Sequence, residues 1–180
     1  MIRIKLGDIF ESEMKTLVNT INCVGVMGKG IAKIYKDRYP KMFEEYKDMC
    51  TKKLIHTGYL YPYYEDNSVK ILNWRSPSKL EYIQEGLNWF IQNYERLKIT
   101  SIAFPPLGCG NGGLDWETVG PLMYQSLKDL PIDIEIYAPF GTEKSKLQVE
   151  FLLVNENKVN KTGVIYEKIN NNWLLVLQLI

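Results

Sequence analysis

Short apolar runs alternate with amphipathic segments along most of the chain, and this alternation predicts its secondary structure. Residues 2–6 alternate apolar and polar side chains with a period of two, which is typical of a strand. A turn-forming run at residues 65–68 separates two further apolar runs, which favours a strand pair. The other predicted strands are residues 16–21, 58–64, 69–73, 99–104 and 132–137.

Apolar residues at helical spacing occupy the segments between these strands. The predicted helices cover residues 30–49, 78–97 and 117–130. Pro40 divides the first of them in two, because proline disfavours the helical conformation in the residue before it. Strands that alternate with helices are typical of a three-layer α/β/α fold with a mostly parallel central sheet, and the ligand of such a fold lies at the carboxyl ends of the strands.

The pattern changes after Gly141. Residues 143–155 have the spacing of a helix, and residues 161–180 favour a hairpin around the three asparagines at 170–172. We therefore expect one domain over residues 1–141. Residues 142–180 are interpreted either as an appendage on that domain or as the start of a second module cut short.

The composition argues against a strongly basic nucleic-acid-binding protein, a cysteine-ligated metal site and a membrane-spanning protein. The 22 basic and 21 acidic residues give a net charge of +1, so no global field attracts nucleic acid, although a local basic patch stays open. The three cysteines, Cys23, Cys50 and Cys109, lack metal-ligand spacing and favour reduced thiols, so we expect neither a metal nor a cofactor. No targeting signal and no apolar run of bilayer length occur, which favours a soluble cytoplasmic protein without a membrane partner.

Two glycine-rich turns carry the clearest chemistry. The first spans residues 22–30 and the second spans residues 105–115, and each follows a predicted strand and precedes a predicted helix. Glycines let backbone N–H groups converge on an anion, and the N-terminus of the following helix adds positive charge. Two such turns at neighbouring strand ends would hold a diphosphate from both sides. Neither turn fits the dinucleotide fingerprint or the Walker-type P-loop.

The order of several motifs over residues 1–140 resembles the macrodomain family of ADP-ribose-binding modules. The motifs are Gly7-Asp8-Ile9, Val18-Asn19-Thr20-Ile21-Asn22, Gly28-Lys29-Gly30-Ile31 and Gly108-Cys109-Gly110-Asn111-Gly112-Gly113. Within the family, the strings at residues 22–32 and 105–116 are most similar to those of DarG-like antitoxins. Such proteins are DNA ADP-ribosyl glycohydrolases, which remove ADP-ribose that a partner toxin attaches to DNA bases.

The resemblance also assigns roles to individual residues. Asp8 and Ile9 would read adenine, Phe140 would stack on it, and Asn22 would orient the distal ribose near C1″ for catalysis. The remaining ligand-binding residues implied by the resemblance are Gly28, Lys29, Gly30 and Ile31 in the first loop, and Pro106, Leu107, Gly108, Cys109, Gly110, Asn111, Gly112, Gly113 and Leu114 in the second. Local roles compete with these: Asp8 is also a common turn residue, and Asn22 also caps loops well.

One segment departs from the DarG-like pattern. Such a chain is expected to carry N-F-P-T-K-R-H-W-R, with the lysine as catalytic residue, where this chain runs from Asn73 straight into Trp74 and Arg75. Neither Lys70 nor Lys79 aligns with that lysine. Trp74 and Arg75 either contact the target of the reaction, or Trp74 packs beneath the shortened loop.

Three functions therefore stay open. The first is removal of ADP-ribose from modified DNA bases, with ADP-ribosylated DNA as substrate and an ADP-ribosyltransferase toxin as partner. The second is binding of ADP-ribose without turnover, which the missing lysine favours. The third is dephosphorylation of ADP-ribose 1″-phosphate, which some macrodomains perform on a similar site.

Overall fold

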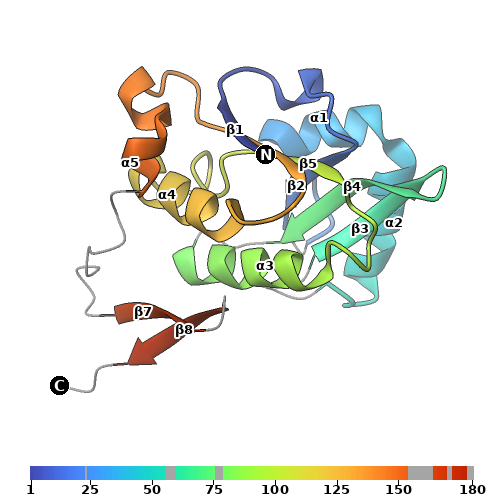
Figure 1. Ribbon diagram of the computed structural model, residues 1–180. Coiled ribbons are helices and arrows are strands. Elements are labelled where there is room, and N and C mark those ends of the chain that lie inside the picture. Colours follow the sequence, from blue (N-terminus) through green and yellow to red (C-terminus); the bar gives the residue numbers. More distant parts are fainter. Residues whose placement is uncertain (23, 56–59, 76–78, 154–163, 170–171, 178–180) are drawn as a thin grey trace.

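A six-stranded sheet forms the centre of the computed structural model, which describes residues 1–22, 24–55, 60–75, 79–153, 164–169 and 172–177 (Figure 1). The strand order is β1-β6-β5-β2-β4-β3, and β3 alone of the six runs antiparallel to its neighbour. The strands are β1 (Ile2–Lys5), β2 (Thr16–Ile21), β3 (Leu60–Glu65), β4 (Ser68–Arg75), β5 (Ser101–Phe104) and β6 (Asp133–Tyr137). The prediction of a mostly parallel sheet is confirmed.

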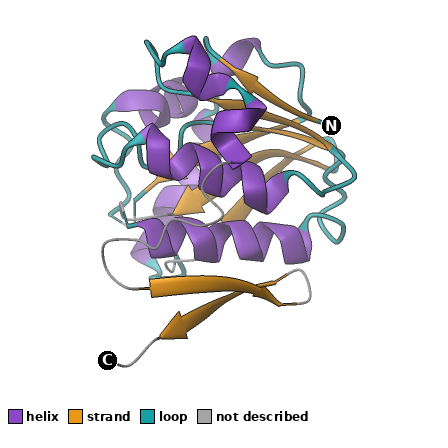
Figure 2. Cartoon of the chain, turned by 60° about the vertical axis from the view of Figure 1, so that its left-hand side comes forward, coloured by secondary structure: helices purple, strands orange, loops and turns teal. Residues whose placement is uncertain are grey.

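Helices cover both faces of this sheet, as the α/β/α prediction requires (Figures 1 and 2). One core lies between the sheet and α1 and α2, and the other lies between the sheet and α3, α4 and α5. The helices are α1 (Gly30–Arg38), α2 (Pro40–Thr51), α3 (Leu80–Asn93), α4 (Trp116–Leu127) and α5 (Val149–Leu153), with short 3-10 helices η1 (Ile9–Glu11) and η2 (Lys144–Leu147). The predicted break before Pro40 is the boundary between α1 and α2.

Trp74 belongs to the hydrophobic core, so the proposed contact with a target base is wrong for this residue. Its side chain is 1% exposed, and its ring meets the Phe104 ring edge-on with 6.1 Å between the centroids. The space for the indole comes from Gly86 of α3, because a Cβ there would lie 2.3 Å from the ring. The alternative of a packing role therefore holds for Trp74 in the core, while residues 76–78, which follow β4, lie outside the described residues. Arg75 continues the backbone of β4, and its side chain lies outside the described residues.

The predicted helix over residues 143–155 is two elements. Extended backbone at Gln148 (ψ 149°) separates η2 from α5. Leu152 of α5 is fully buried, and the Gln125 side chain of α4 donates a hydrogen bond to the Leu152 carbonyl (3.0 Å). Residues 149–153 are thus packed into the helical layer of the core.

The predicted C-terminal hairpin is confirmed. Strands β7 (Val164–Ile169) and β8 (Asn172–Leu177) pair antiparallel in a second, two-stranded sheet. Asn170 and Asn171, the predicted turn, lie outside the described residues. That the hairpin belongs to an appendage or a second module stays a prediction.

Among the helices of the described residues, none is both long enough and apolar enough to span a bilayer.

The contact between Trp74 and Gly86 predicts an unusual response to a helix-favouring substitution. Gly86→Ala gains up to about 1 kcal/mol of helix propensity, but overpacking typically costs about 1–3 kcal/mol and a ring cannot yield as a flexible chain end does. We expect a net loss of stability of about 2 kcal/mol in urea denaturation. The exposed neighbour Glu85→Ala serves as control and should stay within about 0.5 kcal/mol of wild type. Equal stabilities for the two variants would contradict this packing.

Candidate functional site

The carboxyl ends of five parallel strands lie along one edge of the sheet, and the predicted site residues follow them. Along this edge β1 is followed by β6, β5 and β2, so the segment with Asp8 comes first, then Phe140, then the second glycine loop, then the first. Strands β5 and β2 are direct neighbours, which makes the two glycine loops neighbours as predicted. The loops also touch, because a Cβ on Gly30 would lie 3.3 Å from Nδ2 of Asn111.

Asn22 shapes the first loop through its side chain. Its Nδ2 donates to the Val26 carbonyl at 2.6 Å, and its Oδ1 accepts from the Val24 N–H at 2.9 Å. The hydroxyl of Tyr46 on α2 also donates to Oδ1, at 2.6 Å. The amide group carries two hydrogens, so one remains for a ligand. The predicted local role of Asn22 is thus real, and it leaves one donor at the strand end.

The first loop ends at an uncapped helix N-terminus. Lys29 is the N-cap of α1 and makes no capping hydrogen bond, and the first turn of α1 contains no acidic residue. The φ of Gly30 is +55°, a conformation that favours glycine. The positive end of α1 therefore meets no carboxylate from its own first turn, which suits a bound anion.

The second loop presents free backbone donors. The N–H groups of Cys109 and Gly113 bond to carbonyls within the loop, at 3.1 and 3.2 Å. In the described chain, the N–H groups of Gly110, Asn111 and Gly112 donate to no protein acceptor. Three successive unbonded donors at the tip of a loop suit a phosphate. Leu107 is buried in the core, so the structure does not support its predicted contact with a ligand through the side chain.

The N-terminus of the helix after the second loop already faces two carboxylates of the chain itself. Asp115 caps α4, accepting the Thr118 N–H at 2.8 Å, and Glu117 adds a second carboxylate to the first turn. The N-terminus of α4 therefore adds less positive charge to the second loop than we expected of a helix after a glycine turn, because these carboxylates lie there. The second loop therefore offers its amides alone.

Beside the second loop lies a hollow of about 350 Å³ with Phe140 at its rim. Phe140 is fully exposed, which is costly for so large an apolar ring and favours a stacking partner. The hollow is lined by Cys109, Leu114, Asp115, Trp116, Glu117, Pro139, Phe140, Gly141, Thr142, Glu143 and Lys146.

Asp8 and Ile9 lie at the end of β1 with part of their hydrogen-bonding capacity free. Oδ1 of Asp8 accepts the Phe10 N–H at 3.0 Å and so caps η1. Within the described residues, the second carboxylate oxygen and the Ile9 N–H have no protein partner. The Ile9 side chain is buried and fixes the segment in the core. One acceptor and one donor are thus left side by side.

The structure also bears on the cysteine of the second loop and on the two lysines considered as catalytic candidates. Burial and the nearby carboxylates of Asp115 and Glu117 raise the pKa of the Cys109 thiol to about 12, so it stays protonated near neutral pH. Lys70 lies near the amino end of β4, since Ile71 pairs with Leu17, and this is the edge opposite the glycine loops. Lys79 is the N-cap of α3, on the carboxyl side of β4, with its ammonium 5.9 Å from the centre of the Tyr82 ring. The described residues contain no cluster of His, Cys, Asp or Glu that could hold a metal.

Tyr46 is a site residue that the sequence did not reveal. Its spacing in the helical pattern indicates a core position, and the ring is indeed buried. Its contact with Asn22 joins residues 24 positions apart, and no local signal marks it.

Known proteins are similar to this chain in sequence and in structure. The family model of the Macro domain matches residues 18–123. A DNA ADP-ribosyl glycohydrolase of Mycobacterium tuberculosis is 42% identical over 162 residues, covering 84% of this chain and 46% of that protein. A Thermosipho africanus DNA ADP-ribosyl transferase-DNA ADP-ribosyl glycohydrolase fusion protein is 35% identical over 173 residues, covering 82% of this chain and 45% of that protein.

A solved structure agrees with these sequence matches. The structure of Thermosipho africanus DarTG in complex with ADP-ribose superposes with a TM-score of 0.75 at 36% identity, covering 84% of this chain and 46% of that one. The chain spans about half the length of the curated relatives it matches.

The second loop predicts that alanine substitutions at two of its glycines differ in their effect on stability. Gly108 has φ +73°, and a Cβ there would lie 2.7 Å from Cδ1 of Leu114, so Gly108→Ala should cost about 1–2 kcal/mol. Gly110 is outside the left-handed region and a Cβ there would meet nothing within 4 Å, so Gly110→Ala should change stability by less than about 1 kcal/mol. Thermal unfolding measures both. A large loss of stability from Gly110→Ala would mean that this glycine is structural.

Proposed function

The chain belongs to the macrodomain family, and we propose that it binds ADP-ribose and removes it from modified bases of DNA. The proposal extends to this chain what its relatives are named for. It assigns the described site to the complete substrate, from adenine to the base that carries the modification.

The order of the loops along the sheet edge carries this proposal. Asp8 with Ile9, then Phe140, then the second loop, then the first loop with Asn22 follow one another as β1, β6, β5 and β2 do. ADP-ribose has its groups in the corresponding order: adenine, its ribose, the diphosphate and the distal ribose. Neighbouring strands are about 4.8 Å apart, so the series extends over roughly 14 Å, a span suited to an extended nucleotide.

Complementary chemistry supports each position. The free oxygen of Asp8 accepts a hydrogen bond from the 6-amino group of adenine, and the Ile9 N–H donates one to a ring nitrogen. The exposed Phe140 ring stacks on the base. The two loops hold the diphosphate between the N-terminus of α1 and the three free amides of the second loop. The remaining amide hydrogen of Asn22 binds a hydroxyl of the distal ribose.

The proposed reaction is hydrolysis at C1″ of the distal ribose. The bond from C1″ to the base nitrogen breaks, a water oxygen bonds to C1″, and the protons of water end on the new hydroxyl and the released base. Breaking this bond passes through a positively charged, oxocarbenium-like state, which the nearby diphosphate stabilises. Asn22 contributes by fixing the ribose, since the Val24, Val26 and Tyr46 contacts hold its amide rigidly.

An ADP-ribosyltransferase toxin is the proposed partner. The Thermosipho africanus relative unites both activities in one protein by its name. We extend that relation to this chain, with ADP-ribosylated DNA as the product of the partner and the substrate of this site. Since the chain spans about half of its relatives, this pairing is a proposal for the whole protein.

ADP-ribose should bind with a Kd of about 1 μM or lower, about −8 kcal/mol, and AMP should bind much more weakly because it lacks the diphosphate. Gly110→Val should cut affinity for ADP-ribose at least tenfold, about 1.4 kcal/mol, by filling the phosphate space. Calorimetry measures both, with the melting temperature of the variant as control. Equal affinities of wild type for AMP and ADP-ribose would overturn the two-loop site.

Turnover is tested with three substrates: ADP-ribosylated DNA, ADP-ribosylated protein and ADP-ribose 1″-phosphate. We expect release of ADP-ribose from the DNA. Asn22→Ala should slow this at least a hundredfold while ADP-ribose binding falls much less, because misplacing the reacting groups costs rate first. Turnover of the 1″-phosphate alone would establish the phosphatase, and binding without any turnover would establish a reader.

Two lysines test whether a relocated lysine carries the reaction. Lys79→Ala probes the candidate on the carboxyl side of β4, and Lys70→Ala at the opposite edge is the matched control. If no lysine takes part, both variants should keep the wild-type rate on ADP-ribosylated DNA within about threefold. A loss of a hundredfold or more from Lys79→Ala alone would identify Lys79 as catalytic.

A further inference from the structure

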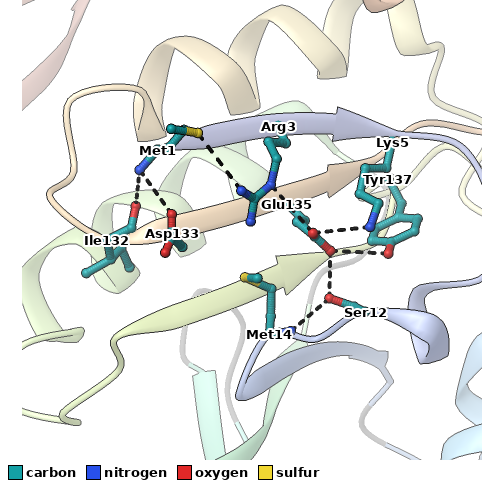
Figure 3. A network of polar contacts seen from close by, with 9 residues as sticks. All are labelled: Met1, Arg3, Lys5, Ser12, Met14, Ile132, Asp133, Glu135 and Tyr137. Carbon is teal, nitrogen blue, oxygen red and sulfur yellow. Dashed lines mark hydrogen bonds and ion pairs between the residues drawn. The ribbon is translucent and has the colours of Figure 1, made fainter.

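The carboxylate of Glu135 on β6 is 5% exposed and is surrounded by polar groups from three segments (Figure 3). Lys5 of β1 donates to Oε1 at 3.2 Å, and Arg3 forms an ion pair with the same oxygen at 3.7 Å. Oε2 accepts from the hydroxyls of Ser12 at 2.7 Å and Tyr137 at 3.2 Å. Burial acts to raise the pKa of the Glu135 carboxyl, but the hydrogen bonds from Ser12 and Lys5 and the charge of Lys5 outweigh it and lower that pKa. Glu135 is therefore ionised near neutral pH.

Pairing of the strands does not need this carboxylate. Residues 2–5 of β1 pair with residues 134–137 of β6 through the backbone. Burying a charge costs free energy that its partners only offset, so a buried ion pair by itself is weak evidence for stability. The bond from Ser12 is different in kind, because it reaches a segment outside the sheet.

Ser12 joins this carboxylate to η1. It is the C-cap of η1, where its N–H bonds to the Ile9 carbonyl at 3.1 Å, and its hydroxyl bonds to Glu135. At the other end of η1, Oδ1 of Asp8 forms the N-cap. The tether from β6 thus holds the short helix whose first residues offer the free oxygen of Asp8 and the free N–H of Ile9.

A second contact holds η1 from the side of the first glycine loop. The Phe10 ring lies 4.7 Å from the Tyr35 ring between centroids, and the Arg38 guanidinium lies 4.1 Å from the Phe10 centroid. Both partners are on α1, the helix that begins at Gly30. The apolar contact fixes where η1 sits, whereas the directional hydrogen bond at Ser12 fixes how it is turned.

We propose that Glu135 is a positioning residue for base specificity: through Ser12 it orients η1 so that Asp8 and Ile9 select adenine. The proposal rests on the proposed function, since it assumes that this end of the site reads the base of ADP-ribose. It assigns a specificity role to a side chain that takes no part in the proposed hydrolysis itself.

The test compares two ligands that differ only at the base, ADP-ribose and its hypoxanthine analogue. Hypoxanthine carries a carbonyl oxygen where adenine has its amino group, and this oxygen faces the Asp8 carboxylate unfavourably. Wild type should therefore prefer ADP-ribose. Ser12→Ala removes the tether to Glu135, together with the hydrogen bond that the Ser12 hydroxyl accepts from the Met14 N–H at 3.2 Å. We expect the ratio of the two Kd values to fall about tenfold, which is the range that a directional hydrogen bond contributes.

Three variants separate positioning from general damage. Lys5→Ala removes one of the two ion pairs on Oε1 and leaves Ser12 bonded to Oε2, so the preference for adenine should stay at the wild-type value. Ser12→Thr restores the hydroxyl and should restore the preference. Glu135→Gln keeps an oxygen that accepts from Ser12 and should retain the preference better than Ser12→Ala, even if its melting temperature falls.

The outcomes distinguish this inference from the proposed function. If Ser12→Ala keeps the full preference, or if Lys5→Ala loses it equally, the positioning role is overturned while binding of ADP-ribose stands. If wild type binds both ligands equally, the base is not read at Asp8 and the inference falls. If wild type binds neither ligand, the proposed function falls as well.

Discussion

The parallel pairing of β2 with β5 is the constraint on which the site depends. Neighbouring parallel strands end at the same edge, so the turns that follow them meet although they are more than seventy residues apart in the sequence. The contact between Gly30 and Asn111 shows how closely they approach. Side chains larger than hydrogen at Gly30 would separate the loops or fill the space for the anion. The glycine at position 30 is thus a consequence of the strand order.

The two loops meet an anion in different ways. The first offers the uncapped N-terminus of α1 and the second offers three free amides, while α4 satisfies its own first turn with Asp115. A carboxylate at the N-terminus of a helix offsets the positive charge there and repels an anionic ligand. Asp115 lines the hollow beside Phe140, and its Oδ1 caps α4 by accepting the Thr118 N–H.

Local pattern predicted the elements, and contacts distant in the sequence decided the exceptions. The alternation of β6 places Ile134 and Ile136 on one face and Glu135 on the other, which by itself predicts a solvent-exposed charge. Glu135 is buried because Ser12, 123 residues away, brings the segment after η1 across it. Trp74 is similar, since the indole fits only because Gly86 of α3 leaves room. The glycine motifs and most of the strands and helices could be predicted because each depends on a few adjacent residues, whereas the order of the strands in the sheet comes from the structure.

In the proposed site, the absence of the expected lysine segment changes what would stand beside the distal ribose. In this chain β4 continues through Trp74 to Arg75, and Arg75 pairs with Ile21, the residue before Asn22. Strand backbone thus lies next to the segment with Asn22, where a DarG-like chain is expected to place a loop with a lysine. A lysine that attacks C1″ would lower the barrier by forming a covalent intermediate. Without one, the rate depends on how rigidly the ribose and the diphosphate are held, since a charged transition state gains most from dipoles that need not reorganise. In the proposed reaction, the three hydrogen bonds on the Asn22 side chain would supply that rigidity, and Tyr46, which donates one of them from α2, would contribute to it.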